Sequence, residues 1–373
     1  MATKKISANK GDVAEAFVGA AVAARYAKRI KNQTSRTLDK VTRKDIDDLL
    51  DDVLSSGSVT RNVKDLRIIT KQVEDNITFK LALPQNAMDF LKIKSNRDDV
   101  SDFINSAINY VNADRRLSLQ SQVFAYNGKV DSIVVDSAGV ADQKGTKVDI
   151  SITVNGKKTR NQISLKVTGG EQFAQVVGFG VDKFDKLFVD LLGLNISKSV
   201  KDKTEGFIEE FNISEAFSVK FQTREDVTNS EWASLLKSAA EVYYKGAASN
   251  MNAVKDTVAF KENLFNAIKF GATRNEEGVM LLKLKGGGKF VQQTFDASFK
   301  NSLIRQSFII ETSFEDNPTI KIFLIDKATN KKGDVLMQLR ARIDSQSTGS
   351  GSNKKYKIML RQLMEADKGF FQI

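Results

Sequence analysis

The chain has 373 residues, with 57 lysines and arginines against 46 aspartates and glutamates, which gives a formal net charge of +11. It contains no cysteine and no histidine. These absences exclude a disulfide framework, a cysteine nucleophile, a Ser-His-Asp triad and a zinc site built from Cys or His. An enzyme of this composition must use carboxylates, lysines, hydroxyls or a cofactor. Any metal would have oxygen ligands, which favours Mg²⁺, Mn²⁺ or Ca²⁺.

The excess of positive charge favours a polyanionic partner, either nucleic acid or an anionic membrane surface. The apolar stretches are short and interrupted by charge, so the sequence predicts no transmembrane helix. The N-terminus has no apolar region of the kind that signal peptides carry. We therefore expect a cytoplasmic protein without a membrane partner.

The first hundred or so residues predict mainly helices. Asp12 is the candidate N-cap of a first helix, and Thr42 of a second helix that ends at Gly57. A short alternating run at 78–83 precedes Pro84, and a third helix is expected across 100–111.

From residue 121 onward the pattern changes to a mixture of strands and helices. Helices are expected from Glu171 to about residue 272, a flexible loop at 344–355, and a last helix over Tyr356–Met364. The expected strands are 132–135, 148–154, 162–167, 279–284, 319–325 and 335–343.

The most informative stretch is a hairpin around Asn155 and Gly156. An Asn-Gly pair between two alternating runs indicates a type I′ turn, because both central residues must take positive φ. We expect Val154 to pair with Lys157 across this turn. Asp149 then faces Gln162, whereas a register slip of two residues would place a serine, Ser164, directly opposite Asp149.

In either register, Asp149, Ser164 and Lys166 lie on one polar face within side-chain reach of each other. An aspartate beside a lysine suits metal-assisted phosphodiester cleavage. The carboxylate can hold a hard cation that lowers the pKa of a bound water, and the lysine can stabilise developing negative charge. The alternative is an ordinary amphipathic hairpin with one solvated face.

The run Val148-Asp149-Ile150 followed by Ile163-Ser164-Leu165-Lys166 resembles the core of the PD-(D/E)xK nuclease superfamily, which includes restriction enzymes and phage nucleases. Its motif is an Asp on one strand and acid-x-Lys on the next antiparallel strand. Asp149 matches the first acid and Lys166 the lysine, whereas Ser164 stands where the second acid usually is. The glutamine-containing stretch 169–178 also resembles phage-type and restriction-type members.

The resemblance implies an α/β (α+β) protein with a restriction-endonuclease-like mixed sheet flanked by helices. It places a nuclease core with N-terminal helices in residues 1–200. Residues 201–373 are then an additional α+β region for DNA binding or oligomerisation. The implied activity is that of a DNA endonuclease dependent on Mg²⁺ or Mn²⁺ in a bacterial cytoplasm, for which a homodimer is one option.

By the same resemblance, Asp149 and Glu15 hold the metal, with Glu15 on a helix that precedes the sheet. The spacing of Asp12 and Glu15 is equally a capping-box pattern. Gln172 is expected to contact the phosphate or a water, and a surface glutamine is the alternative reading. Glu171 is a second candidate for the missing acid.

Basic residues outside the site are candidates for contacts to a phosphate backbone. One group lies on the hairpin arm and a denser one near the C-terminus, where Tyr356 is interleaved with the cations; a solvated charged surface is the alternative. We expect DNA contacts at Lys157, Lys158, Arg160, Arg340, Arg342, Lys354 and Lys355.

Two other functions remain open at this stage. The first is a non-catalytic DNA-binding protein with a degenerate nuclease core, which Ser164 favours. The second is a phage structural or assembly protein in which the hairpin is scaffold.

Overall fold

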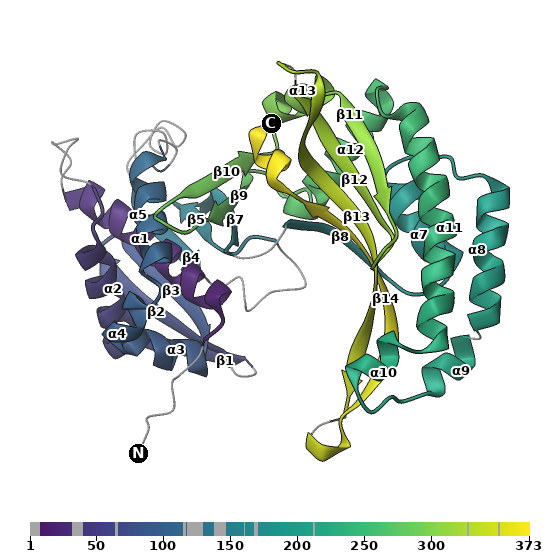
Figure 1. Ribbon diagram of the computed structural model, residues 1–373. Coiled ribbons are helices and arrows are strands. Elements are labelled where there is room, and N and C mark those ends of the chain that lie inside the picture. The colour runs from purple at the N-terminus through teal and green to yellow at the C-terminus, as the bar shows by residue number, and fades with distance from the viewer. Residues whose placement is uncertain are drawn as a thin grey trace. The chain divides into compact units, whose positions relative to one another are not determined.

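The chain forms two compact units, each of mixed α and β structure (Figure 1). The first comprises Met1–Gly169 and Ala272–Phe295, and the second Gly170–Gly271 and Asp296–Ile373. The α/β class expected from the sequence is therefore confirmed. The computed structural model describes residues 8–31, 40–63, 66–114, 117, 130–137, 147–159, 161–167, 171–211, 213–326, 328–349 and 351–373.

Both units are discontinuous in sequence, which differs from the continuous boundary expected near residue 200. Residues 170–200 belong to the second unit, and the hairpin at 272–295 returns to the first. The return is made by β9 (Val279–Leu284), which pairs in parallel with β7 (Gln162–Lys166). A division read along the chain cannot anticipate such a pairing.

The first unit is built around a mixed sheet. One part has the strand order β1-β2-β3-β4-β5-β6 and the other β10-β9-β7. An antiparallel bridge between Ile150 and Ile163 connects them. The pairs β3–β4 and β7–β9 are parallel. The remaining strands are β1 (Ser58–Val63), β2 (Leu66–Glu74), β3 (Ile77–Pro84), β4 (Ile133–Ser137), β5 (Ser151–Val154), β6 (Lys157–Lys158) and β10 (Phe290–Thr294).

The helices of the first unit pack around α1, which contacts β3, β4, α2 and α5. A Cβ at Gly19 would meet the Ser137 side chain at 2.8 Å, so this glycine permits close packing of α1 on the sheet. The helices are α1 (Lys10–Lys31), α2 (Arg43–Ser56), α3 (Gln85–Lys92), α4 (Lys94–Asp98) and α5 (Ser101–Ala113).

The start of α1 differs from the expectation. The helix begins at Lys10, and the Gly11 amide donates to Oδ1 of Asn9 at 2.9 Å. Asp12 therefore lies in the first turn and is not the N-cap, so the capping-box reading of Asp12 and Glu15 is wrong.

The expected limits of α2 are confirmed. Thr42 forms a reciprocal capping box with Asp45, and the helix ends at Gly57. The first hundred residues nevertheless contain β1, β2 and β3 as well as helices. In β2 only Ile69 is buried, so this strand has little of the apolar alternation that marks a strand in sequence.

The second unit has an antiparallel sheet in the order β11-β12-β13-β14-β8. Helix α11 packs against β11, β12 and β13, and α8 packs against α11 (Figure 1). The strands are β8 (Glu171–Val177), β11 (Phe308–Ser313), β12 (Thr319–Asp326), β13 (Lys331–Thr348) and β14 (Lys355–Ala366). The helices are α7 (Val181–Asp185), η3 (Lys186–Leu191), α8 (Lys198–Phe211), α9 (Ile213–Ser218), α10 (Arg224–Thr228), α11 (Glu231–Val254), α12 (Val258–Thr273), α13 (Ala297–Ile304), η4 (Gly351–Asn353) and η5 (Lys368–Gln372).

Two predicted helices are strands in this unit. The segment that starts at Glu171 is β8, and Tyr356–Met364 lies within β14. β14 pairs with β13 on one side and with β8 on the other, and this pairing overrides the helical preference of its Leu, Met, Arg and Gln residues. The loop expected at 344–355 is also shorter, because β13 continues to Thr348.

No helix in the described part of the chain is both long enough and apolar enough to cross a membrane.

Candidate functional site

The hairpin at the candidate site has the predicted turn. Asn155 and Gly156 take φ values of 48° and 75°, both positive as a type I′ turn requires. Val154 pairs with Lys157 as expected. The Asn155 Oδ1 atom also accepts hydrogen bonds from the Asp131 and Ser132 amides at 2.9 and 3.1 Å, which ties the turn to the start of β4.

The register slips by two residues between the turn and the site. Ile150 bridges Ile163, whereas the register at the turn would pair it with Asn161. Where the register changes, the side-chain amide of Gln162 takes the place of a backbone partner. Its Nε2 donates to the carbonyls of Ile152 and Thr159 at 3.0 and 2.9 Å. The two-residue slip that was the second of the two expected registers is therefore present at Ile150.

A β-bulge lies at Asp149. The amides of Asp149 and Ile150 both donate to the Ile163 carbonyl, at 2.8 and 3.0 Å. Two residues on one strand thus oppose one residue on the other, which removes Asp149 from the regular alternation of side chains. Bulges of this kind redirect single side chains, and they are frequent beside active sites.

The three polar residues predicted on the hairpin are brought together. The Lys166 Nζ atom lies 3.8 Å from Oδ2 of Asp149. It also donates to Oγ of Ser164 at 3.4 Å. The same Oδ2 atom accepts the backbone N–H of Leu165 at 2.5 Å. Ser164 is buried, whereas the Asp149 and Lys166 side chains are 28% and 35% exposed.

Burial raises the pKa of the Asp149 carboxyl above its ordinary value, although the nearby Lys166 ammonium, the Leu165 amide and Lys147 oppose the shift. A second lysine adjoins the site, because Lys283 on β9 is the register partner of Lys166 on β7. One ammonium group, that of Lys166, therefore lies close to the Asp149 carboxylate, and a second lysine stands beside Lys166 in the strand register.

Sequence reasoning missed the position of Lys283 beside Lys166. The two residues meet only through the parallel pairing of β7 with β9, which are far apart in the chain. The one usable signal was a lysine near the end of the strand predicted at 279–284.

Glu15 is buried on α1, a helix that contacts both β4 and β7. Its backbone carbonyl accepts a hydrogen bond from Oγ of Ser137 at 3.0 Å. Ser137 ends β4, the neighbour of β5 in the sheet, so Glu15 belongs to the same unit as Asp149.

Gln172 belongs to the second unit. It lies on β8 with an exposed side chain, and its amide donates to Oε1 of Gln175 at 2.8 Å. Its neighbour Glu171 is buried on the same strand.

The donor set is compatible with a hard cation. Within the described residues, no three acidic side chains converge on a possible metal position. At the site Asp149 supplies a carboxylate and Ser164 a hydroxyl, and the predicted ligand Glu15 lies on α1, a helix that contacts β7. Mg²⁺ is commonly held by one or two carboxylates, with waters and substrate phosphate completing its shell, so these oxygen donors fit that ion.

The predicted DNA contacts on the hairpin arm lie at an exposed position. Lys157 and Lys158 form β6, and Nζ of Lys158 lies 3.6 Å from a carboxylate oxygen of Glu276. Arg160 lies outside the described residues.

The basic residues near the C-terminus are partly neutralised by acids. Arg340 pairs with Glu365 at 2.8 Å. Arg342 pairs with Asp344 at 3.0 Å.

At the start of β14, Nζ of Lys354 lies 5.8 Å from the centroid of the Tyr356 ring, and Lys355 donates to the Gln222 side chain.

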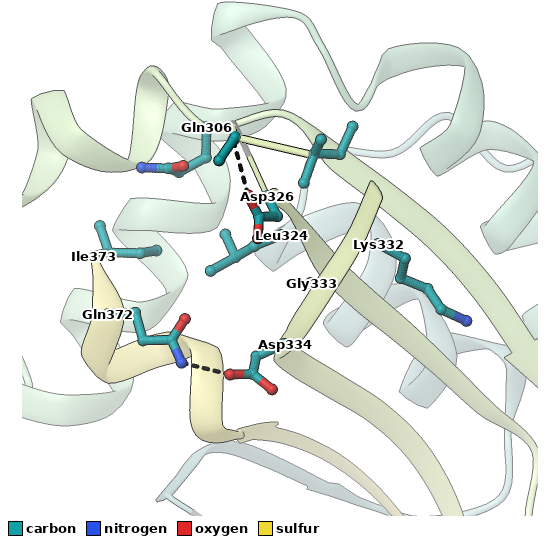
Figure 2. Close-up of a pocket in the computed structure, with 10 residues that line it drawn as sticks. Gln306, Leu324, Asp326, Lys332, Gly333, Asp334, Gln372 and Ile373 are labelled. Atoms are coloured by element: carbon teal, nitrogen blue, oxygen red, sulfur yellow. Dashed lines mark hydrogen bonds between the residues drawn. The ribbon is translucent and has the colours of Figure 1, made fainter. Parts of the chain in front are cut away.

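A depression of about 690 Å³ in the second unit is separate from these residues (Figure 2). Two of its acidic residues accept hydrogen bonds from neighbouring protein groups. Asp334 accepts the Gln372 amide at 2.5 Å, and Asp326 accepts the Ala328 backbone N–H at 2.8 Å. Its lining is Gln306, Leu324, Ile325, Asp326, Ala328, Lys332, Gly333, Asp334, Gln372 and Ile373, none of them a predicted site residue.

Comparison with known proteins gives no match: no family model, curated protein or solved structure is significantly similar to this chain.

Proposed function

We propose that the chain is a metal-dependent DNA endonuclease of the PD-(D/E)xK type, with its site at Asp149, Ser164 and Lys166. The observation that carries this proposal is the approach of Lys166 Nζ to Asp149 Oδ2 at 3.8 Å, beside the bridge between Ile150 and Ile163. Both side chains are partly exposed, so a phosphodiester can reach them.

The charge around Lys166 supports an anionic substrate. Lys166 and Lys283 occupy paired positions on neighbouring strands, where like charges repel and destabilise the sheet. A phosphate oxygen between them would relieve this repulsion through charge-assisted hydrogen bonds. The two lysines therefore favour a phosphate-containing substrate over a neutral one.

Each residue of the site has a role in the proposed reaction. Asp149 and Glu15 would hold the divalent cation, which when bound polarises the phosphate and activates a water. Lys166 would stabilise the negative charge that develops on the phosphate oxygens. Ser164 would orient Lys166 through their 3.4 Å contact. The proposed contact of Gln172 with the phosphate rests on the resemblance alone.

The partner and setting follow from the same proposal. The substrate would be DNA in the cytoplasm of a bacterial cell. A homodimer would place two sites on the two strands of a duplex, as two-fold symmetry permits.

A non-catalytic DNA-binding protein is the second candidate, and one observation favours it. Ser164 stands where the superfamily usually has its second acid, and a hydroxyl adds no negative charge to a cation site. The two candidates share DNA binding and differ in whether DNA is cut.

Nicking of supercoiled plasmid in Mg²⁺, Mn²⁺ or EDTA tests the proposal. We expect nicking that requires metal and that falls roughly 10²-fold or more in Lys166→Ala. Lys92→Ala is the matched control, because it removes an exposed lysine of the first unit that is not among the predicted DNA contacts. Equal nicking by the wild type and Lys166→Ala would overturn the site. Bound but uncut DNA under every metal condition would favour the second candidate.

A further inference from the structure

The far half of the β13–β14 hairpin extends beyond most of the sheet, and we call residues 341–348 and 355–362 the ribbon. The pairing of β12 with β13 stops at Arg340, and that of β8 with β14 stops at Arg361. The two strands of the ribbon continue past these limits to the pair Thr348–Lys355, as Figure 1 shows for β14.

The two faces of the ribbon differ in composition. One face carries the buried residues of the ribbon, which are Ala341, Ile358, Leu360 and Gln362. Helices α9 and α10 contact the ribbon strands. Two residues paired across the strands point to the same face, and successive pairs point to alternate faces. The second face is therefore formed by every other pair of the ribbon. Its members are Arg342, Asp344, Gln346, Thr348, Lys355, Lys357, Met359 and Arg361.

Positive charge dominates this second face. By register it holds four cationic side chains, and Asp344 is the only acidic one among the described residues of the ribbon. A fifth cation, Lys220, adjoins it. The bridge between Phe221 and Tyr356 sets an antiparallel register that places the exposed Lys220 opposite Lys357.

Arg342 and Arg361 stand directly opposite each other and share one carboxylate. Asp344 Oδ2 lies 3.0 Å from Nη2 of Arg342 and 3.7 Å from Nε of Arg361. One negative charge cannot neutralise two guanidinium groups, and like charges placed opposite each other destabilise a strand pair. The pair therefore retains capacity for an added anion such as a phosphodiester.

We propose that this face of the ribbon binds the phosphate backbone of duplex DNA. Alternate residues on a strand are about 7 Å apart, so the cations form a row that an extended polyanion can follow and a single phosphate cannot. A membrane surface fits less well, because by register Met359 is the one apolar member of the face. The choice of DNA as the polyanion rests on the proposed nuclease function.

The test measures the salt dependence of binding to a short DNA duplex by fluorescence anisotropy in EDTA, where metal-dependent cleavage cannot interfere. In Lys355→Gln/Lys357→Gln, the slope of log K against log salt should become shallower by about 2, because about 0.9 is lost for each phosphate contact. The matched control is Lys198→Gln/Lys203→Gln on α8, which removes the same charge from two exposed lysines and should leave the slope unchanged.

A variant that is expected to strengthen DNA binding distinguishes a loss of phosphate contacts from a loss of structure. Asp344→Asn frees Arg342 and Arg361 from their shared carboxylate, so it should tighten DNA binding and steepen the salt slope by about 1.

Wild-type slopes in both ribbon variants would overturn the inference, and so would equal weakening by the α8 control or tighter binding of an RNA duplex. These outcomes are distinct from failure of the proposed function. If the ribbon variants change binding as expected but the wild type never nicks plasmid, the ribbon inference stands and the nuclease proposal falls. If the wild type nicks plasmid and the ribbon variants bind DNA as the wild type does, the nuclease proposal stands and the ribbon inference falls.

Discussion

The carboxylate of Asp149 accepts the backbone N–H of Leu165 at 2.5 Å, where β5 no longer supplies a partner for β7. The Ile163 amide, two residues earlier on the same edge, still donates to the Ile150 carbonyl. A side chain therefore replaces a backbone carbonyl at the end of the strand pair. The candidate metal ligand is also part of the fold, which makes Lys166 the cleaner position for testing activity.

Replacement of Asp149 should separate these two roles. In Asp149→Ala the Leu165 N–H loses its acceptor, and we expect the free energy of unfolding to fall by about 1–2 kcal/mol. Asp149→Asn keeps a carbonyl oxygen at this position and should lose less. Urea denaturation of both variants measures the difference. If Asp149→Ala were as stable as the wild type, the structural role of this carboxylate would be wrong.

The stability contribution of Asp149 should depend on pH in a defined direction. Burial raises the pKa of this carboxyl above its ordinary value of 3.8. The folded protein then binds the proton more tightly than the unfolded chain. The resulting stabilisation is fully present below 3.8 and is lost as the pH rises through the raised pKa.

The stability of the wild type relative to Asp149→Asn should therefore decline from acid to neutral pH. Urea unfolding of both proteins across a pH series gives this difference directly. A constant difference, or one that grows with pH, would contradict the raised pKa.

The buried Arg97 should be a main determinant of stability in the first unit. It pairs with Asp47 at 3.0 Å and with Asp51 at 2.7 Å, and its Nε donates to the Leu91 carbonyl at 2.7 Å. Arg97→Met leaves both carboxylates without this cation and the carbonyl without its donor. We expect the free energy of unfolding to fall by about 3 kcal/mol, measured by urea denaturation.

Lys94→Met is the control for Arg97, because Lys94 pairs with the same Asp51 at 2.9 Å but is 71% exposed. Its loss should change the free energy of unfolding by no more than about 0.5 kcal/mol. Comparable losses in the two variants would show that burial of Arg97 adds nothing to its ion pairs.

Part of the candidate site could be predicted from the sequence. The Asn155–Gly156 turn and the alternation of its strands place Asp149 near Lys166 in either register, and the structure brings them together. The choice of register was open, because it depends on the bulge at Asp149 and on the buried amide of Gln162.

The sequence by itself determined the features that depend on neighbouring residues. The Thr42 capping box and the stop at Gly57 are set within one turn of a helix. The exclusion of cysteine and histidine chemistry follows from composition alone.

Tertiary structure decided what depends on distant partners. β8 and β14 are strands because they pair with each other and β14 pairs with β13. Lys283 stands beside Lys166 in the register because β9 pairs with β7, although the two strands are far apart in the chain. Pairing satisfies the backbone N–H and C=O groups that face a neighbouring strand, so it outweighs local helical preference, and the residues that provide it can lie anywhere in the sequence.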